Sequence, residues 1–424
     1  MIRTHTFACA LPKADADALN RESGRVYSNT LVRHYRIYRR SGHWLSPGAG
    51  ERVEDALGPS SLHAHSRDAA QQGFYKAVKT ARALKAAGFM DARYPHRRKW
   101  YRTTIWKRTG IRLQSGALVL ARARELAPVR VSVPSSLAHL PVTAFRELRL
   151  VWDQAACRYA WHAVIEDGIA PVPTTASGVA GVDLGEVHPA ALTDGRAAAV
   201  ISCRALRSCV QYTHKRLAAL RAKQERRTTG SARWKRLGRR KNRFLAQQKR
   251  RERDLLHKAS RAVVDWAVAH QVGTLAVGNV RTVGDGKRLK KEQQQKVSSG
   301  WSHGTMRRYL GYKAEAVGIT VDDTVPEAYT SQTCPGCGAR HKPKGRVYAC
   351  RACGFRGARD VVGAANILSR FLHQQVGRVL PPPRVMYLRP FERASGRPRS
   401  SSRPDTADLA RSAPSRASRE AAPL

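Results

Sequence analysis

Two closely spaced cysteine pairs constrain this chain more than any other feature of its sequence. Cys334 and Cys337 form one C-x2-C pair, and Cys350 and Cys353 form a second pair after the spacer 338–349. Each pair fits a tight turn whose two thiolates reach one side of a tetrahedral ion, so the four cysteines predict a closed structural zinc site. Two disulfides are the alternative, which is disfavoured because a C-x2-C pair rarely closes on itself without strain.

Carboxylates flank this predicted ribbon on both sides. Glu327 precedes the first cysteine pair and Asp360 follows the second, so a folded ribbon would hold both acids near one place. Asp183 offers a third acid, inside the apolar run 179–185, where a buried strand is predicted. A buried carboxylate is costly unless it is paired or bound to metal, so the three acids predict a hard-cation site. For Asp183 alone, pairing with a lysine is the alternative.

The charge balance predicts a polyanionic partner. The sequence contains 77 Lys and Arg against 31 Asp and Glu, which gives a net charge of +46 over 424 residues. This excess goes far beyond what solubility needs and favours nucleic acid. An anionic membrane surface is the runner-up, but no long apolar span is evident to anchor the chain there. Because the N-terminus lacks the apolar core of a secretion signal, a cytoplasmic location is expected.

Strand-like alternation dominates the first part of the chain and is interrupted by helical segments. Helical periodicity is evident at 15–40 and 67–87. Short runs typical of strands lie at 118–120, 129–133, 148–152 and 159–165. This pattern predicts a small β-barrel or sandwich with a helical insertion. Residues 93–107 interleave bases and aromatics, which suits nucleic acid, and an edge strand with buried tryptophans is an equally weighted alternative.

A second unit is predicted to begin near residue 174. Residues 203–261 carry 21 Lys and Arg against three acids and break at 228–231, which predicts two long basic helices in a hairpin. Segments this basic usually follow phosphates. A helix from Asp360 to about 374 is predicted after the ribbon, and the Ser/Arg/Pro-rich segment 376–424 is expected to be disordered.

Three segments resemble the TnpB family, the OrfB-type transposases of insertion sequences, which are relatives of the type V CRISPR effector nucleases. The segments are 181–185 (GVDLG), 329–338 (YTSQTCPGCG) and 359–367 (RDVVGAANI). The resemblance implies a multidomain α+β and α/β fold. It assigns a wedge β-barrel with a helical insertion (about 12–92) to 1–173, an RNase H-like (RuvC) core to 174–329 and 357–375, a zinc ribbon to 330–356 and a disordered tail to 376–424.

The resemblance also implies an RNA-guided DNA endonuclease encoded by a transposable element. Asp183 matches the first of the family's three Mg²⁺-binding acids, and Asp360 matches the third. The implied partners are DNA and a guide RNA made from the element's own end. A monomer bound to RNA is expected, in the cytoplasm and associated with the bacterial nucleoid when DNA is bound.

One position departs from the family pattern. Gly278 and Asn279 stand where the family usually has its second acid, and neither offers a carboxylate. In the favoured interpretation, Glu327 supplies the missing group, so that Asp183, Glu327 and Asp360 bind Mg²⁺. In the alternative, the nuclease is inactive and the protein is an RNA-guided DNA-binding protein or repressor. A strand transferase is disfavoured, because no pair of histidines with a nearby catalytic tyrosine is evident.

Overall fold

Antiparallel strands and an inserted group of helices build the first of two units into which the chain divides. This computed structural model describes residues 2–55, 59–96, 101–154, 156–166, 168, 170, 172, 174–279 and 303–390. Unit 1 comprises Met1–Ala170 and Gly230–Ala246, and unit 2 comprises Pro171–Thr229 and Gln247–Leu424. Nowhere in the described ranges does a helix combine the length and apolarity needed to span a bilayer.

Unit 1 contains two antiparallel sheets. The first has the order β1-β7-β6-β2, with β1 (Ile2–Ala8), β2 (Thr104–Lys107), β6 (Phe145–Asp153) and β7 (Arg158–Glu166). The second joins β3 (Ile111–Gln114), β4 (Ala117–Leu120) and β5 (Val129–Ser132). Period-two alternation directs one face of each strand inward, so that Trp106, Leu148 and Trp161 are fully buried in a shared core.

Three helices lie between β1 and β2 in the sequence of unit 1. They are α1 (Lys13–Ser41), α2 (Pro47–Asp55) and α3 (Ala64–Ala86). Tyr27 and Leu31 of α1 pack against Phe74 and Val78 of α3, which are spaced one helical turn apart on each helix. The left-handed residue Gly42 ends α1 and donates its N–H to the carbonyl of Tyr38 at 2.8 Å.

Unit 2 is built on a six-stranded mixed sheet with the order β12-β11-β8-β9-β10-β15. The strands are β8 (Gly178–Asp183), β9 (Ala190–Thr193), β10 (Ala198–Ile201), β11 (Val272–Asn279), β12 (Thr320–Pro326) and β15 (Met386–Leu388). Strands β8, β11 and β12 are parallel, whereas β9 runs antiparallel to both of its neighbours. The carboxyl ends of β8, β11 and β12 therefore lie at one edge of the sheet.

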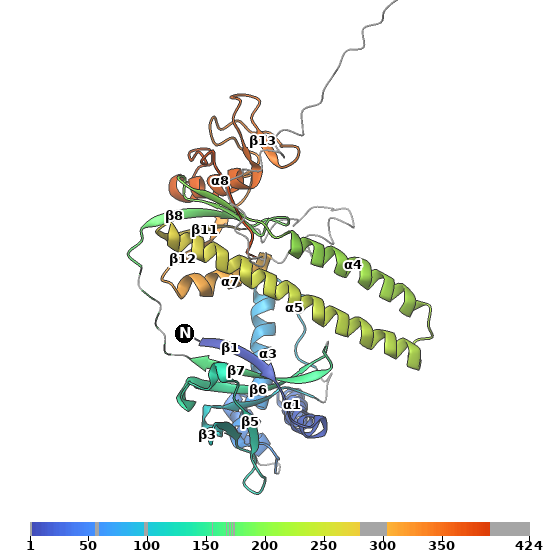
Figure 1. Cartoon of the computed structure of the whole chain (residues 1–424). Coiled ribbons are helices and arrows are strands. Elements are labelled where there is room, and N and C mark those ends of the chain that lie inside the picture. Colours follow the sequence, from blue (N-terminus) through green and yellow to red (C-terminus); the bar gives the residue numbers. More distant parts are fainter. Residues whose placement is uncertain are drawn as a thin grey trace, which may run out of the picture. The chain divides into compact units, whose positions relative to one another are not determined.

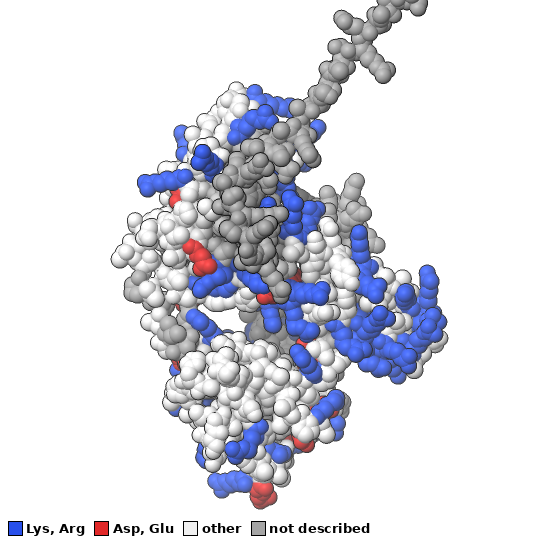
Figure 2. Space-filling model, in the orientation of Figure 1, with Lys and Arg blue, Asp and Glu red and all other residues white. Residues whose placement is uncertain are grey.

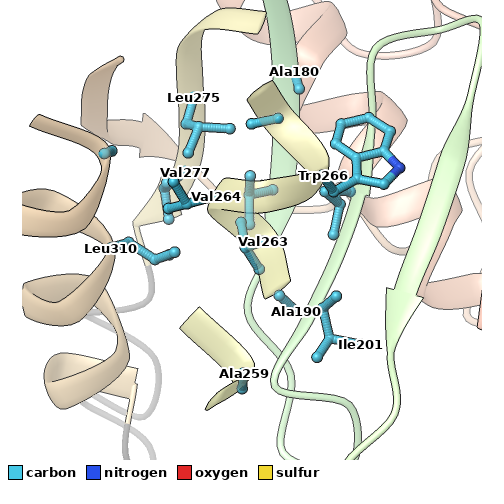
Figure 3. Close-up of a cluster of buried hydrophobic side chains, with 14 of the residues drawn as sticks. Ala180, Ala190, Ile201, Ala259, Val263, Val264, Trp266, Leu275, Val277 and Leu310 are labelled. Atoms are coloured by element: carbon cyan, nitrogen blue, oxygen red, sulfur yellow. The ribbon is translucent and has the colours of Figure 1, made fainter. Parts of the chain in front are cut away.

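Helices cover both faces of this sheet, as Figure 1 shows. They are α5 (Ala232–Ala269), α7 (His303–Glu315) and α8 (Arg359–His373), whereas α4 (Arg204–Glu225) projects away from the sheet (Figure 1). On one face, Val263 and Val264 of α5 pack with Leu275 of β11 and Leu310 of α7 (Figure 3). On the other face, α8 covers β8, β9 and β11, with Ile367 packed beside Ala276.

The basic segment forms long helices, and α5 continues unbroken through the largely apolar residues 262–269. Both α4 and α5 carry dense Lys and Arg side chains (Figure 2). Sγ of Cys209 on α4 lies 3.4 Å from Oε1 of Gln248 on α5, which brings the two helices together within unit 2.

The predicted boundary of the disordered tail, residue 376, is too early, because the chain is still folded at Leu388. Strand β15 pairs in parallel with β10, and the N–H of Ser202 donates to the carbonyl of Leu388 at 2.9 Å. Leu388 also packs against the main core of unit 2. Edge pairing therefore orders the chain through a three-residue strand that is too short to show a periodic pattern. Residues 391–424 lie outside the described residues, as does the basic segment 280–302.

Candidate functional site

Four cysteine sulfurs converge in the ribbon. The Sγ atoms of Cys334 and Cys353 lie 3.6 Å apart, as do those of Cys337 and Cys350, and all four lie within 4.8 Å of one another. Zinc–sulfur bonds of about 2.3 Å in a tetrahedron place the sulfurs about 3.8 Å apart, whereas a disulfide needs about 2.05 Å. The predicted meeting of these cysteines is confirmed, and their spacing fits a zinc ion.

The cysteine turns and the ribbon strands explain this convergence locally. Strand β13 (Val347–Ala349) pairs with β14 (Arg356–Ala358), and the glycines at 338 and 354 adopt left-handed φ values of +73° and +74°. The buried ring of Tyr348 packs with Cys334, Cys350 and Val362, and Val362 belongs to α8. The ribbon is thus built directly onto α8, the helix whose first turn carries Asp360.

The thiols differ in acidity because their surroundings differ. Backbone N–H donors from Cys353 and then Ala352, with burial opposing them, lower the pKa of Cys350 to about 6. Burial raises the pKa of Cys334 to about 12. Zinc binds thiolates, so an ion in this cluster would have to displace the proton of Cys334, and zinc affinity should fall as the pH falls.

Strand alternation directs Asp183 toward α8. On β8, Val182 belongs to the core shared with α5, so Gly181 and Asp183 face the opposite side. A Cβ on Gly363 of α8 would overlap Oδ2 of Asp183, and a Cβ on Gly181 would overlap the backbone of α8. Both glycines are therefore needed for this close approach of helix and strand.

Asp183 and Glu327 form a buried acidic pair, and Asp360 lies close enough for its charge to affect the pKa of Asp183. Burial, followed by the charges of Glu327 and Asp360, raises the pKa of Asp183 well above its usual value, although the residue keeps some solvent exposure. Burial raises the pKa of Glu327 to about 7, against a hydrogen bond from protonated Asp183 and the charge of Arg307. With both groups ionised, Oε1 of Glu327 is buried without a hydrogen-bond partner.

The missing side chain at Gly278 makes room for Glu327. Pro326, the last residue of β12, pairs with Asn279, so Glu327 extends beyond the end of β11. A Cβ on Gly278 would lie 2.6 Å from Oε1 of Glu327 and 2.8 Å from Cδ1 of Ile367. A carboxylate at 278 and the present position of Glu327 therefore exclude each other.

Helix α8 holds the turn that carries Glu327. The guanidinium of Arg370 donates to the carbonyls of Pro326 and Ala328 at 2.6 and 3.1 Å. The hydroxyl of Thr330 donates to the carbonyl of Glu327 at 2.9 Å. These contacts fix the backbone on both sides of the acid, so the orientation of Glu327 depends on α8 as well as on β12.

Buried side chains complete this support. Arg307 donates to Oδ2 and to the carbonyl of Asp323 at 2.9 and 2.7 Å, and to Oδ1 of Asn279 at 3.4 Å. Asn366 is fully buried and joins three backbone segments. Neither residue was assigned a role from the sequence. Asn366 lies in the family motif, which is the one signal that pointed to it.

Replacing Asn366 with leucine is expected to destabilise the ribbon–helix junction by about 3–5 kcal/mol. Its Nδ2 donates to the carbonyls of Thr330 and Thr333 at 2.7 and 2.8 Å, and its Oδ1 accepts from the N–H of Gly377 at 2.8 Å. Leucine would leave all three backbone groups unpaired. Thermal unfolding should show a lower melting temperature than for His373→Leu, an exposed change on the same helix. Equal melting temperatures would contradict this role.

Asp360 stands at the first turn of α8 and faces the ribbon. Nη1 of Arg346 lies 3.1 Å from its Oδ2. The loop after β8 is also close, because the charges of Asp360 and Arg346, after the larger effect of burial, act on the pKa of His188. The fold therefore gathers the three predicted acids at one edge of the sheet, with Asp183 and Glu327 in direct contact and Asp360 paired to an arginine.

Two family models match this chain over the regions that build the site. The model described as "Probable transposase" (OrfB_IS605) matches residues 162–284, and the model described as "Cas12f1-like, TNB domain" matches residues 303–367. The first region contains Asp183 and Gly278, and the second contains Glu327, the four cysteines and Asp360.

Curated relatives match part of this chain. A TnpB-like protein of Methanocaldococcus jannaschii is 27% identical over 144 residues, which is 34% of this chain and 50% of that protein. InsQ of Escherichia coli (strain K12), provisionally assigned as an RNA-guided DNA endonuclease, is 32% identical over 212 residues, 47% of this chain and 50% of that protein. The CRISPR-associated endodeoxyribonuclease Cas12f1 of Sulfoacidibacillus thermotolerans is 31% identical over 115 residues, 26% and 25% of the two chains. The chain spans half or less of each relative's length.

The fold is similar to that of a solved Cas12f1, in a complex with guide RNA and target DNA. The TM-score is 0.59 at 14% sequence identity, and the match covers 84% of this chain and 83% of that one. At this identity the likeness shows the fold alone. The mixed α/β class predicted from the sequence is confirmed, and so is the resemblance of the motifs to the TnpB family.

Proposed function

We propose, from this confirmed likeness to the TnpB family, that the chain is an RNA-guided DNA endonuclease encoded by a transposable element. The observation that carries the proposal is the meeting of Asp183 and Glu327, with Asp360 beside them, at the carboxyl edge of the unit 2 sheet. Both family models match the segments that deliver these acids. Acids with strongly raised pKa values at a strand edge are typical of functional sites.

The acid cluster fits a divalent cation such as Mg²⁺. Two buried carboxyl groups repel each other when both are ionised, and Oε1 of Glu327 then has no donor. A cation would remove both penalties, and carboxylate oxygen is the ligand that Mg²⁺ prefers. We propose that Asp183, Glu327 and Asp360 hold Mg²⁺, which when bound would supply an activated water and stabilise the leaving oxygen of a phosphodiester.

The chain's own residues orient these acids and keep them ready to ionise. The charge of Arg307 lowers the pKa of Glu327 against the effect of burial. Arg370 and Thr330 fix the backbone that carries Glu327, and Gly363 allows Asp183 to lie against α8. Rigid placement of this kind limits the reorganisation that the site needs when substrate arrives.

We assign the domains as the family resemblance implies. Unit 2 without the ribbon would be the RuvC-like nuclease core, extended by β15 to Leu388, and 330–356 would be the zinc ribbon, with zinc in a structural role. The strands of unit 1 would form the wedge domain, with α1–α3 as its inserted helices. The basic helices α4 and α5 would bind guide RNA or the RNA–DNA duplex through phosphates.

A guided cleavage assay tests the proposal. The protein would be co-expressed with RNA from its own locus, purified as the complex and offered duplex DNA that matches the guide beside a randomised flank. We expect Mg²⁺-dependent cleavage by the wild type and none by Glu327→Gln. Full cleavage by Glu327→Gln would remove Glu327 from the site. Tight guide-dependent binding without wild-type cleavage would support the alternative, a nuclease-inactive DNA-binding protein marked by Gly278 and Asn279.

The raised pKa of Glu327 predicts that stability in EDTA falls as the pH rises. A glutamate with a pKa of about 7 when folded and about 4.3 when unfolded binds more protons in the folded state between these values. Its stabilising contribution is complete below about pH 4 and is lost as the pH rises through 7, and we expect a loss on the order of 2 kcal/mol. The measurement is the melting temperature of wild type and Glu327→Gln from pH 5.5 to 8.

Comparison with Glu327→Gln isolates this effect from histidine titration. Burial lowers the pKa values of His34, His63, His188 and His257, so these groups oppose the glutamate by reducing stability as the pH falls. The histidines are common to both proteins and cancel in the difference. A difference in melting temperature that does not grow with pH would show that Glu327 ionises normally in the folded protein.

A further inference from the structure

The Arg346–Asp360 ion pair places a ribbon cation on an acid of the nuclease core. Arg346 immediately precedes β13, and its carbonyl accepts the N–H of Arg359 at 2.9 Å. The guanidinium of Arg359 reaches the carbonyl of Gly345 at 3.5 Å. Two contacts therefore anchor the backbone at 345–346 to the start of α8, and the side chain of Arg346 is held within reach of Asp360.

This ion pair is easily exchanged. The side chain of Arg346 is 52% exposed and that of Asp360 is 25% exposed, and such pairs contribute only about 0–1 kcal/mol. The pair nevertheless occupies Oδ2 of Asp360, one of the oxygens a cation would need. The pair also lies beside the loop that follows β8, because both charges act on the pKa of His188. A guanidinium at this place competes with a metal ion for the same carboxylate.

We infer that Arg346 is a positioning residue that holds Asp360 until a backbone phosphate of the DNA substrate takes Arg346 in exchange, leaving Asp360 free to bind the cation. The inference rests on the proposed function. A guanidinium binds phosphate in the same forked geometry in which it binds carboxylate, so one anion can replace the other. The exchange involves no covalent step. The cation site would therefore be complete only when substrate is present. Because Arg346 belongs to the ribbon, this control would also require a folded ribbon.

The first test measures Mn²⁺ binding to the full-length, zinc-loaded protein without DNA, by electron paramagnetic resonance. We expect Arg346→Gln to bind Mn²⁺ about threefold to fivefold more tightly than wild type, because the competing cation is gone. Arg351→Gln, an exposed change in the same ribbon, is the matched control for the loss of one positive charge. Equal Mn²⁺ affinities for Arg346→Gln and Arg351→Gln would overturn the inference.

The second test measures steady-state cleavage by the RNA-loaded complex. Arg346→Gln should raise KM for target DNA severalfold more than Arg351→Gln, and Arg346→Lys should restore part of the loss because lysine binds phosphate as a point charge. A KM equal to that of the control would refute the phosphate exchange.

Asp360→Asn separates this inference from the proposed function. The variant should lose most Mn²⁺ affinity whether or not Arg346 is present. If Asp360→Asn retains wild-type Mn²⁺ affinity, the acid site itself is misassigned. If Asp360→Asn loses affinity while Arg346→Gln matches its control, the acid site stands and only the role of Arg346 fails.

Discussion

Replacing Asp183 with alanine is expected to reduce guided DNA cleavage by on the order of 10³-fold or more while leaving RNA binding intact. Asp183 is central because its carboxyl contacts Glu327 and lies against α8. Glu327 cannot take its place, since its own carboxyl already lies against Gly278. The measurement is the cleavage rate at saturating Mg²⁺, with RNA affinity determined on the same preparations. Glu186→Ala, an exposed acid three residues further along, is the control.

The same variant should lose cleavage activity but gain stability. Two buried carboxyl groups with raised pKa values destabilise the folded protein at pH 8, so removing one should raise the melting temperature in EDTA. An inactive protein that is also more stable would identify a functional acid rather than a structural one. A variant that loses RNA binding, or that melts earlier than wild type, would instead show that Asp183 supports the fold.

Replacing Cys350 with serine is expected to remove zinc from the ribbon and to disable cleavage together with it. The cluster has four ligands at tetrahedral spacing, and apparent binding energies of structural zinc run to about 10–16 kcal/mol. Loss of the ion should release Tyr348 from Val362 of α8, and with it the ribbon that carries Arg346. We expect zinc content to fall to background and the melting temperature to drop by several degrees.

Metal analysis of the purified protein checks this prediction. Cys157→Ser, an exposed cysteine of unit 1, controls for the loss of a thiol. The zinc content of Cys157→Ser should equal that of wild type. Unchanged zinc in Cys350→Ser would refute the four-cysteine site.

Sequence reasoning identified the cysteines and the acids that the fold brings together, because the relevant signals are local. The cysteine turns need only a few neighbouring residues, and the apolar run around Asp183 identifies a buried strand by itself. Helices α1 and α3 and strands β4 to β7 of unit 1 were predicted for the same reason, as periodic patterns of ordinary length, whereas α2 and β3 were not predicted. Glu327 could be proposed because it lies just before the ribbon and because Gly278 and Asn279 offer no carboxylate.

What sequence reasoning missed depends on contacts between distant segments. That Gly278 makes room for Glu327 follows from the register of β11 against β12, which no local pattern reveals. The hydrogen bonds of Asn366 and the reach of Arg346 to Asp360 arise only when the ribbon packs on α8. Strand β15 was not predicted, because it lies in a segment whose composition resembles a disordered tail. In each case the decisive interaction joins residues that lie far apart in the chain.

The support of Glu327 by Asn366 and Arg370 defines what can be exchanged between homologous proteins. The acid belongs to the segment before the ribbon, yet its turn is closed by a helix after the ribbon, which also receives the N–H of Gly377. A chimera that transplants only residues 330–356 would separate side chains from their hydrogen-bonding partners, because Asn366 and Arg370 would remain from the recipient protein. The segment 326–377 should therefore behave as one cassette, and grafts with both junctions outside it should be the ones that retain activity.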